Sequence, residues 1–206
     1  ICADAISCDW TATASVAPSG VENCPSASIA YDITGATTAS GSGSAEGEVF
    51  ALGLSTVEYT ITAANGQTAT CSFNVIVEDC TDPTIDVCPS DIVALANISA
   101  CENEQTLTAP TVSDNCSVPG DIVISYRVFN PDNSVTGLIP GAIPFYTFQS
   151  GISIVEWVVE DEAGNTTTCS QQVTINEVLP TAGAGADAEI CISASPYTLS
   201  GSASDA

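Results

Sequence analysis

An internal repeat constrains the fold of this chain more than any other feature of the sequence. The stretch Gly53–Tyr59 (GLSTVEY) aligns with Gly151–Trp157 (GISIVEW), 98 residues later. The same offset continues without a gap to Cys71 and Cys169 and beyond them. A chain that repeats in this way consists of consecutive copies of one structural unit. Each unit has about 90 to 100 residues, which is close to the size of an immunoglobulin-like sandwich.

The local pattern within each unit predicts β-strands. Val57, Tyr59 and Ile61 alternate with polar residues, as in a strand with one buried and one solvated face. The segments 64–67 and 162–165 each contain a glycine and predict hairpin turns, and no segment shows capped helical periodicity. Strands are expected at residues 11–16, 29–33, 56–62, 68–77, 92–95, 106–109, 122–129, 152–160 and 166–175. The predicted fold class is all-β, with tandem Ig-like β-sandwich domains in a linear, disulfide-stapled array.

The repeat and two proline-containing joints divide the chain. The joints lie at Asp79–Pro83 and Glu177–Thr181. The expected domains are residues 1–79, an Ig-like domain with its first strand missing or shortened, and residues 80–178, a second such domain. Residues 179–206 differ in sequence and are expected to begin a third β-sandwich repeat. The chain is therefore expected to be a window from a longer array.

The charge of the chain excludes several classes of function. One arginine, Arg127, is the only Lys or Arg against 25 Asp and Glu, there is no His, and the formal net charge is −24. Such a chain cannot neutralise a nucleic-acid backbone, and an anionic membrane surface would repel it. It lacks a histidine general base and a lysine nucleophile, so no enzymatic activity is expected. A hydrophobic content of 45% also excludes a disordered acidic tail.

The ten cysteines predict disulfides. They form no CxxC pair, and without histidine a zinc cluster or an activated catalytic thiolate is not expected. An even number at wide spacing is typical of cystines in an oxidising, extracellular compartment. No apolar run approaches the length of a membrane span, so no membrane insertion is expected.

Three motifs carry a resemblance to a known family. They are VCPSDI at residues 87–92, APTVSDNC at 109–116 and VEWVVEDEAGNTTTC at 155–169. Residues 82–177 resemble the HYR (hyalin repeat) domain through them, and residues 8–79 resemble it mainly in their second half, without the CP strand. Residues 182–201 resemble repeats that accompany HYR domains in giant surface proteins of gliding bacteria with a type 9 secretion system. The resemblance implies an Ig-like extracellular module associated with adhesion, located at the cell surface, and it brings no known catalytic residues.

The resemblance also implies disulfide pairs. It suggests Cys88 with Cys169, after which the two remaining cysteines of that unit pair as Cys101 with Cys116. By the alignment of the repeats, the pair equivalent to Cys101–Cys116 in the first unit is Cys8–Cys24. Cys71 is then expected to pair with Cys2. The mates of Cys80 and Cys191 stay open, and either could join a neighbouring domain or another chain.

One cluster of acidic residues is a candidate metal site. Glu78, Asp79 and Asp82 lie together at the first joint, and the family topology implies Asp114 or Asp161 nearby. No cofactor is required for the expected role, but carboxylate oxygens at such a boundary suit Ca²⁺. The alternative is that these acids only keep the surface solvated.

The sequence therefore predicts a non-enzymatic stalk or repeat segment of a large extracellular adhesin or filament, with a link to gliding motility. Its expected partners are the neighbouring domains of the same long chain. The first alternative is a subunit of a self-assembling extracellular fibre, with identical chains as partners and Cys80 or Cys191 as intermolecular links. The second alternative is a carbohydrate-binding or hydrolytic module.

Overall fold

The computed structural model describes residues 1–13, 16–18, 27–97, 100–141, 145–178, 181–183 and 202–204. These residues form strands, turns and irregular segments without an α-helix, and they hold three disulfides. The predicted all-β, disulfide-bonded fold class is confirmed. Within the described residues, no helix is long and apolar enough to cross a membrane.

The chain forms two compact units, each assembled from three segments. The first comprises Ile1–Thr84, Ser113–Ile122 and Glu160–Thr167. The second comprises Ile85–Val112, Val123–Val159 and Thr168–Ala206. Residues 113–122 and 160–167, which the sequence assigned to the second domain, therefore belong to the first unit. These two segments connect strands of the second unit, and their own contacts are with the first.

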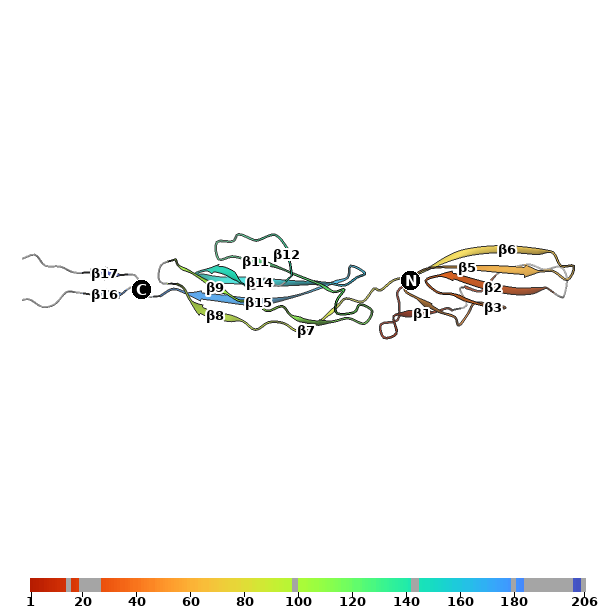
Figure 1. The fold of residues 1–206 in the computed structure, drawn as a ribbon, viewed down its shortest axis with the longest axis horizontal. Coiled ribbons are helices and arrows are strands. Elements are labelled where there is room, and N and C mark those ends of the chain that lie inside the picture. The colour runs from red at the N-terminus through yellow and green to blue at the C-terminus, as the bar shows by residue number, and fades with distance from the viewer. Residues whose placement is uncertain are drawn as a thin grey trace, which may run out of the picture. The chain divides into compact units, whose positions relative to one another are not determined.

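The first unit is built on a four-stranded antiparallel sheet (Figure 1). Its order is β3 (Ala39–Ser42), β2 (Ser28–Gly35), β5 (Gly53–Thr62) and β6 (Thr68–Val77). A separate pair, β1 (Asp9–Thr11) and β4 (Val49–Ala51), contributes Trp10 and Phe50 to the same core. The alternation of side chains along β5 buries Val57 and Tyr59, as the sequence pattern predicts.

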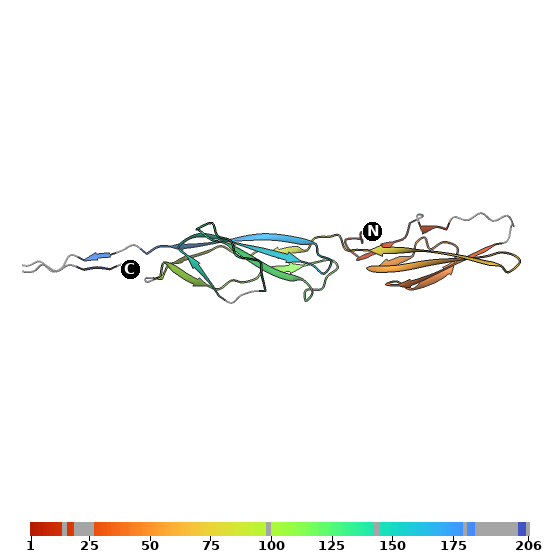
Figure 2. The same cartoon turned by 90° about the horizontal axis from the view of Figure 1, so that it is seen from above.

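The second unit repeats this plan with more strands (Figures 1 and 2). Its main sheet has the order β12-β11-β14-β15-β8, and β9–β13 and β7–β10 form two further pairs. The β14–β15 hairpin corresponds to β5–β6. The strand bounds are β7 Thr84–Val87, β8 Ile92–Leu95, β9 Glu102–Gln105, β10 Thr111–Ser113, β11 Val123–Phe129, β12 Ile139–Pro140, β13 Tyr146–Gln149, β14 Gly151–Glu160 and β15 Thr166–Asn176.

The core of the second unit is centred on aromatic side chains. Trp157, which aligns with Tyr59, is fully buried and lies 5.3 Å from Tyr126, measured between ring centroids.

One difference between the units concerns the edge of the main sheet. The strand β8 pairs in parallel with β15, whereas β6 lies at the edge of its sheet. Beyond residue 178, the structure describes the backbone of a short antiparallel pair, β16 (Thr181–Gly183) and β17 (Ser202–Ser204).

Two expected strands differ from the structure. The strand expected at 11–16 is β1, which ends at Thr11, and residues 14–15 of that range lie outside the described part. The strand expected at 106–109 is irregular, and β9 precedes it at Glu102–Gln105. Gln105 pairs with Tyr146, which is the first residue of β13. Residues after Gln105 therefore have no residue of β13 opposite them with which to form hydrogen bonds.

Candidate metal site

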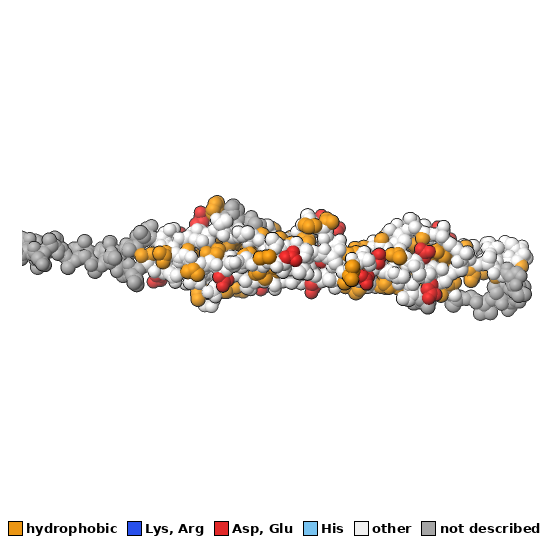
Figure 3. Space-filling view, turned by 90° about the horizontal axis from the view of Figure 1, so that it is seen from below, with side chains coloured by type: hydrophobic (Ala, Val, Ile, Leu, Met, Phe, Trp, Pro, Cys, Tyr) orange, Lys and Arg blue, Asp and Glu red, His pale blue; other side chains and the backbone are white. Residues whose placement is uncertain are grey.

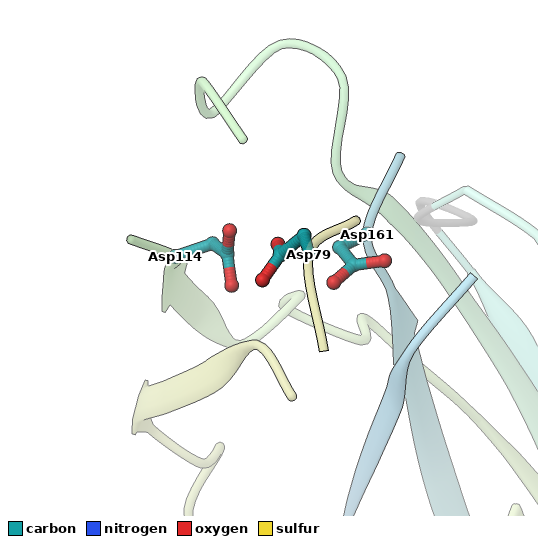
Figure 4. A group of neighbouring side chains, drawn as sticks. All are labelled: Asp79, Asp114 and Asp161. Atoms are coloured by element: carbon teal, nitrogen blue, oxygen red, sulfur yellow. The ribbon is translucent and has the colours of Figure 1, made fainter. Parts of the chain in front are cut away.

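Three aspartates from separate parts of the chain meet in the first compact unit. Asp79 follows β6, Asp114 follows β10 and Asp161 follows β14. One carboxylate oxygen from each lies within 4.8 Å of the others. Figure 4 shows the carboxylate of Asp79 between those of Asp114 and Asp161. The three strand ends thus bring together hard oxygen atoms that are far apart in the sequence.

Local hydrogen bonds orient these carboxylates but leave two oxygens free. Both oxygens of Asp161 accept bonds from Asn165, one from the backbone N–H and one from the side-chain amide, each at 2.8 Å. Asp114 Oδ2 accepts backbone N–H bonds from Cys116 at 2.8 Å and Ser117 at 2.7 Å. Asp79 Oδ1 accepts the N–H of Thr81 at 3.0 Å. Asp79 Oδ2 and Asp114 Oδ1 are buried and have no hydrogen-bond partner.

Burial increases the electrostatic cost of this arrangement. Asp79 is 8% exposed and Asp161 is 4% exposed, while Asp114 is partly buried. Two like charges at such distances repel by about 3 kcal/mol at an effective dielectric constant of about 20. The chain has no Lys and no His, and its one Arg, Arg127, forms an ion pair with Glu156. No cationic side chain of this protein therefore offsets the repulsion.

The cluster lies beside a hollow that admits solvent. The hollow has a volume of about 670 Å³, and Asp79, Ser117 and Asn165 are among its walls. The amide of Asn165 also donates to the backbone oxygen of Asp79, at 3.2 Å. Of the three aspartates, Asp79 is the one that lines this hollow.

The structure keeps only one of the three metal ligands expected from the sequence. Asp79 is in the cluster, whereas Glu78 and Asp82 are exposed and lie outside it. Glu78 is adjacent to Asp79 in an extended segment, and adjacent side chains of such a segment point to opposite sides. The resemblance implied Asp114 or Asp161 nearby, and both are members of the cluster. Their signals in the sequence were the motifs DNC and EDEAGN.

The disulfides also differ from the expected set. Cys88 is bonded to Cys169, the pair that the resemblance implies. The pair Cys101–Cys116 is wrong because Cys116 is bonded to Cys8, 108 residues away, and the pair Cys8–Cys24 is wrong for the same reason.

The remaining cysteines divide into three groups. Cys2 is bonded to Cys80 rather than to Cys71. Cys71 and Cys101 are exposed and unbonded, while Cys24 and Cys191 lie outside the described residues. The alignment of the two repeats could not reveal the actual pairs, because it matches each cysteine to its counterpart and not to its partner.

Comparison with known proteins supports the HYR resemblance. Residues 8–77 match the model of the HYR domain family. The chain is 28% identical to hyalin of Lytechinus variegatus over 135 residues, 64% of this chain and 22% of that protein. It is 28% identical to hyalin of Strongylocentrotus purpuratus over 153 residues, 72% of this chain and 11% of that protein. The chain thus spans about a fifth and a tenth of the length of these relatives.

Two solved structures are more distant. The fibronectin(III)-like modules of Clostridium thermocellum CbhA have 15% identity and a TM-score of 0.34, over 77% of this chain and 83% of that one. Cadherin-like domains 1 to 4 of zebrafish RET have 11% identity and a TM-score of 0.28, over 76% of this chain and 42% of that one. The family match falls on the first repeat, although the motifs quoted above are more complete in the second. Residues 8–77 are therefore similar to the HYR domain, and the chain is similar to part of hyalin.

Proposed function

We propose that this chain is a non-enzymatic, load-bearing repeat segment of a large extracellular adhesion protein. The likeness to the HYR domain and to hyalin supports an adhesion protein, and three disulfides are typical of an oxidising, extracellular compartment. The observation that carries the load-bearing role is the order of the disulfides along the chain.

The disulfides shorten the covalent path between the two ends of the described chain. A force applied at both ends passes from Cys2 directly to Cys80, along the short segment to Cys88, and then directly to Cys169. The two loops that this path skips span 78 and 81 residues. At about 3.5 Å per residue, roughly 55 nm of chain is protected from extension. Such a segment transmits tension without lengthening, as a stalk requires.

Single-molecule pulling tests this role. The oxidised chain, held at its two ends, should give no unfolding step of the length of either loop, whereas reduction should release about 55 nm. The Cys88→Ser/Cys169→Ser double variant should release only about 18 nm, because the force then passes from Cys2 to Cys8 and through Cys8–Cys116. Opening Cys8–Cys116 in the Cys8→Ser/Cys116→Ser variant should release nothing, because that bond is not on the shortest path. Unfolding steps of full length in the oxidised chain would contradict the proposal.

We place the parent protein among giant surface adhesins of the kind exported by gliding bacteria. The support is the resemblance of residues 182–201 to the repeats of such proteins. An antibody against this chain should then label intact cells of the source organism, and deletion of the gene should impair surface spreading. Labelling only after the cells are permeabilised would contradict a surface location.

A self-assembling fibre is the second candidate, favoured by the exposed, unbonded Cys71 and Cys101. Against it, Asp and Glu are spread over the face drawn in Figure 3, so identical chains at −24 repel one another. Light scattering under non-reducing conditions separates the two: a monomer supports the stalk, and disulfide-linked oligomers support the fibre. A carbohydrate-binding module gains little support, because Tyr59 and Trp157 are buried and cannot stack on a sugar.

A further inference from the structure

We propose that Asp79, Asp114 and Asp161 together bind one Ca²⁺ ion. This site goes beyond the load-bearing role and does not depend on it. The three residues belong to the same compact unit, and one oxygen from each lies within 4.8 Å of the others.

The strongest observation is the unsatisfied oxygen of Asp79. This side chain is more than nine-tenths buried, and its Oδ2 accepts no hydrogen bond, while Figure 4 shows its carboxylate lying between the other two. Asp114 Oδ1 is likewise buried without a partner. Buried polar atoms in folded proteins almost always have a partner, so two free anionic oxygens in one cluster indicate a missing cation.

The chemistry of the donors selects a hard divalent ion. The cluster offers carboxylate oxygens, the chain has no His, and the nearby Cys8 and Cys116 are bonded to each other. Zn²⁺ prefers nitrogen and sulfur ligands, whereas Ca²⁺ takes six to eight oxygens in flexible geometry. Mg²⁺ demands a near-ideal octahedron and releases its water reluctantly. Carboxylates from three separate loops suit the more tolerant ion.

The ion would connect three segments that lie far apart in the sequence. Asp114 lies two residues from Cys116, and Asp161 is held by Asn165, whose amide also contacts the backbone oxygen of Asp79. These three segments come together only in the folded chain. A ligand that binds only the folded state stabilises it by mass action, so Ca²⁺ should raise the melting temperature.

Calorimetry on the full oxidised chain tests the site. After removal of metal with EDTA, titration with CaCl₂ at constant ionic strength should show one saturable site, with a Kd of about 10⁻⁴ to 10⁻³ M, as in extracellular calcium modules. A saturating concentration should raise the melting temperature by roughly 5 °C. MgCl₂ should bind at least tenfold more weakly.

Matched variants assign the binding to the cluster. Asp79→Asn should weaken Ca²⁺ binding at least tenfold, and in EDTA it should raise the melting temperature because it removes one of three mutually repelling charges. Asp82→Asn makes the same charge change three residues away, at an exposed position outside the cluster, and should bind Ca²⁺ like the parent. If Asp79→Asn does not fold, Asp114→Asn takes its place with the same expected loss.

Three results would overturn the proposal. One is the absence of a saturable heat with the parent chain. Another is equal loss of binding in the Asp79→Asn and Asp82→Asn variants, which would indicate diffuse attraction to an acidic surface. The third is equal affinity for Mg²⁺ and Ca²⁺, which would remove the assignment to calcium. None of these results affects the pulling behaviour expected from the disulfides.

Discussion

Single side chains at matching places in the two repeats make different use of their polar atoms. The hydroxyl of Tyr59 donates to the backbone oxygen of Val16 at 2.7 Å and accepts the N–H of Ala45 at 2.9 Å. Trp157 aligns with Tyr59, but its Nε1 is buried without a partner, as is the hydroxyl of Tyr126. The same kind of buried polar atom therefore stabilises one core and is unsatisfied in the other.

Removing one buried hydroxyl from each core should have different effects on stability. Tyr59→Phe leaves the Val16 oxygen and the Ala45 N–H without a buried partner and should lower the free energy of unfolding by about 1–3 kcal/mol. Tyr126→Phe removes an unsatisfied atom and should leave that free energy unchanged or slightly higher. Urea unfolding of both variants measures the difference. Equal destabilisation would show that the Tyr126 hydroxyl has a partner in solution.

A third tyrosine should make stability depend on alkaline pH. The hydroxyl of Tyr31 donates to the carboxylate of Glu48, and this bond, followed by burial and charge repulsion, raises the pKa of Tyr31. The stability that this raised pKa contributes is fully present below pH about 10, the pKa of an unfolded tyrosine, and is lost as the pH rises further. Melting temperatures measured from pH 8 to 11 should therefore fall less in Tyr31→Phe than in the parent. Parallel declines would contradict the contribution of this bond.

At the scale of elements, the two long hairpins are the part of the fold that local sequence predicts best. The strands expected at 56–62, 68–77, 152–160 and 166–175 lie within β5, β6, β14 and β15. Their turns contain Gly66 with φ 85° and Gly164 with φ 91°, a region that favours glycine. Alternation and turn chemistry involve neighbouring residues only, which is why they can be read without the tertiary structure.

A substitution in the first of these turns isolates the backbone effect. A Cβ at Gly66 would meet no atom within 4 Å, so Gly66→Ala should act only through its left-handed φ. We expect a loss of about 1 kcal/mol in the free energy of unfolding. Gly120→Ala is the control, because that site is equally open and lacks the positive φ. A loss of the same size in both variants would rule out backbone strain as the cause.

At the scale of the whole molecule, the three disulfides among the described residues supply long-range order to a chain with almost no cationic side chains. At a net charge of −24, self-repulsion opposes the compact state. The bonds Cys2–Cys80, Cys8–Cys116 and Cys88–Cys169 each close a loop of at least 78 residues. Cross-links that close long loops restrict the unfolded chain most in the chain-entropy model.

Loss of one such bond should therefore cost substantial stability. The Cys88→Ala/Cys169→Ala double variant should lower the free energy of unfolding of its unit by about 4.5 kcal/mol, the value that the chain-entropy model gives for a loop of this size. Cys71→Ala removes an exposed, unbonded cysteine at the aligned position of the first repeat and should change stability little. Denaturant unfolding of both variants tests this. A large loss in Cys71→Ala would show that this thiol has a partner.

The candidate metal site was only partly predictable, and the reason is geometric. Glu78, Asp79 and Asp82 are close in sequence, but only Asp79 faces the cluster. Asp114 and Asp161 come from distant segments that reach Asp79 only when β6, β10 and β14 end at the same place. The motifs around Asp114 and Asp161 carry the family resemblance. They do not specify which carboxylates meet in the folded chain.

The sequence by itself determined that this chain is a repeated, all-β, disulfide-bonded protein without the side chains that nucleic-acid binding or histidine catalysis requires. These properties depend on composition, alternation and turn residues, which act over a few positions. Only the tertiary structure decided that Cys8 bonds to Cys116 and that Asp79 meets Asp114 and Asp161. Such partners lie far apart along the chain, and the residues next to each of them do not specify its partner. Their choice depends on which strand ends converge once the sheets have packed.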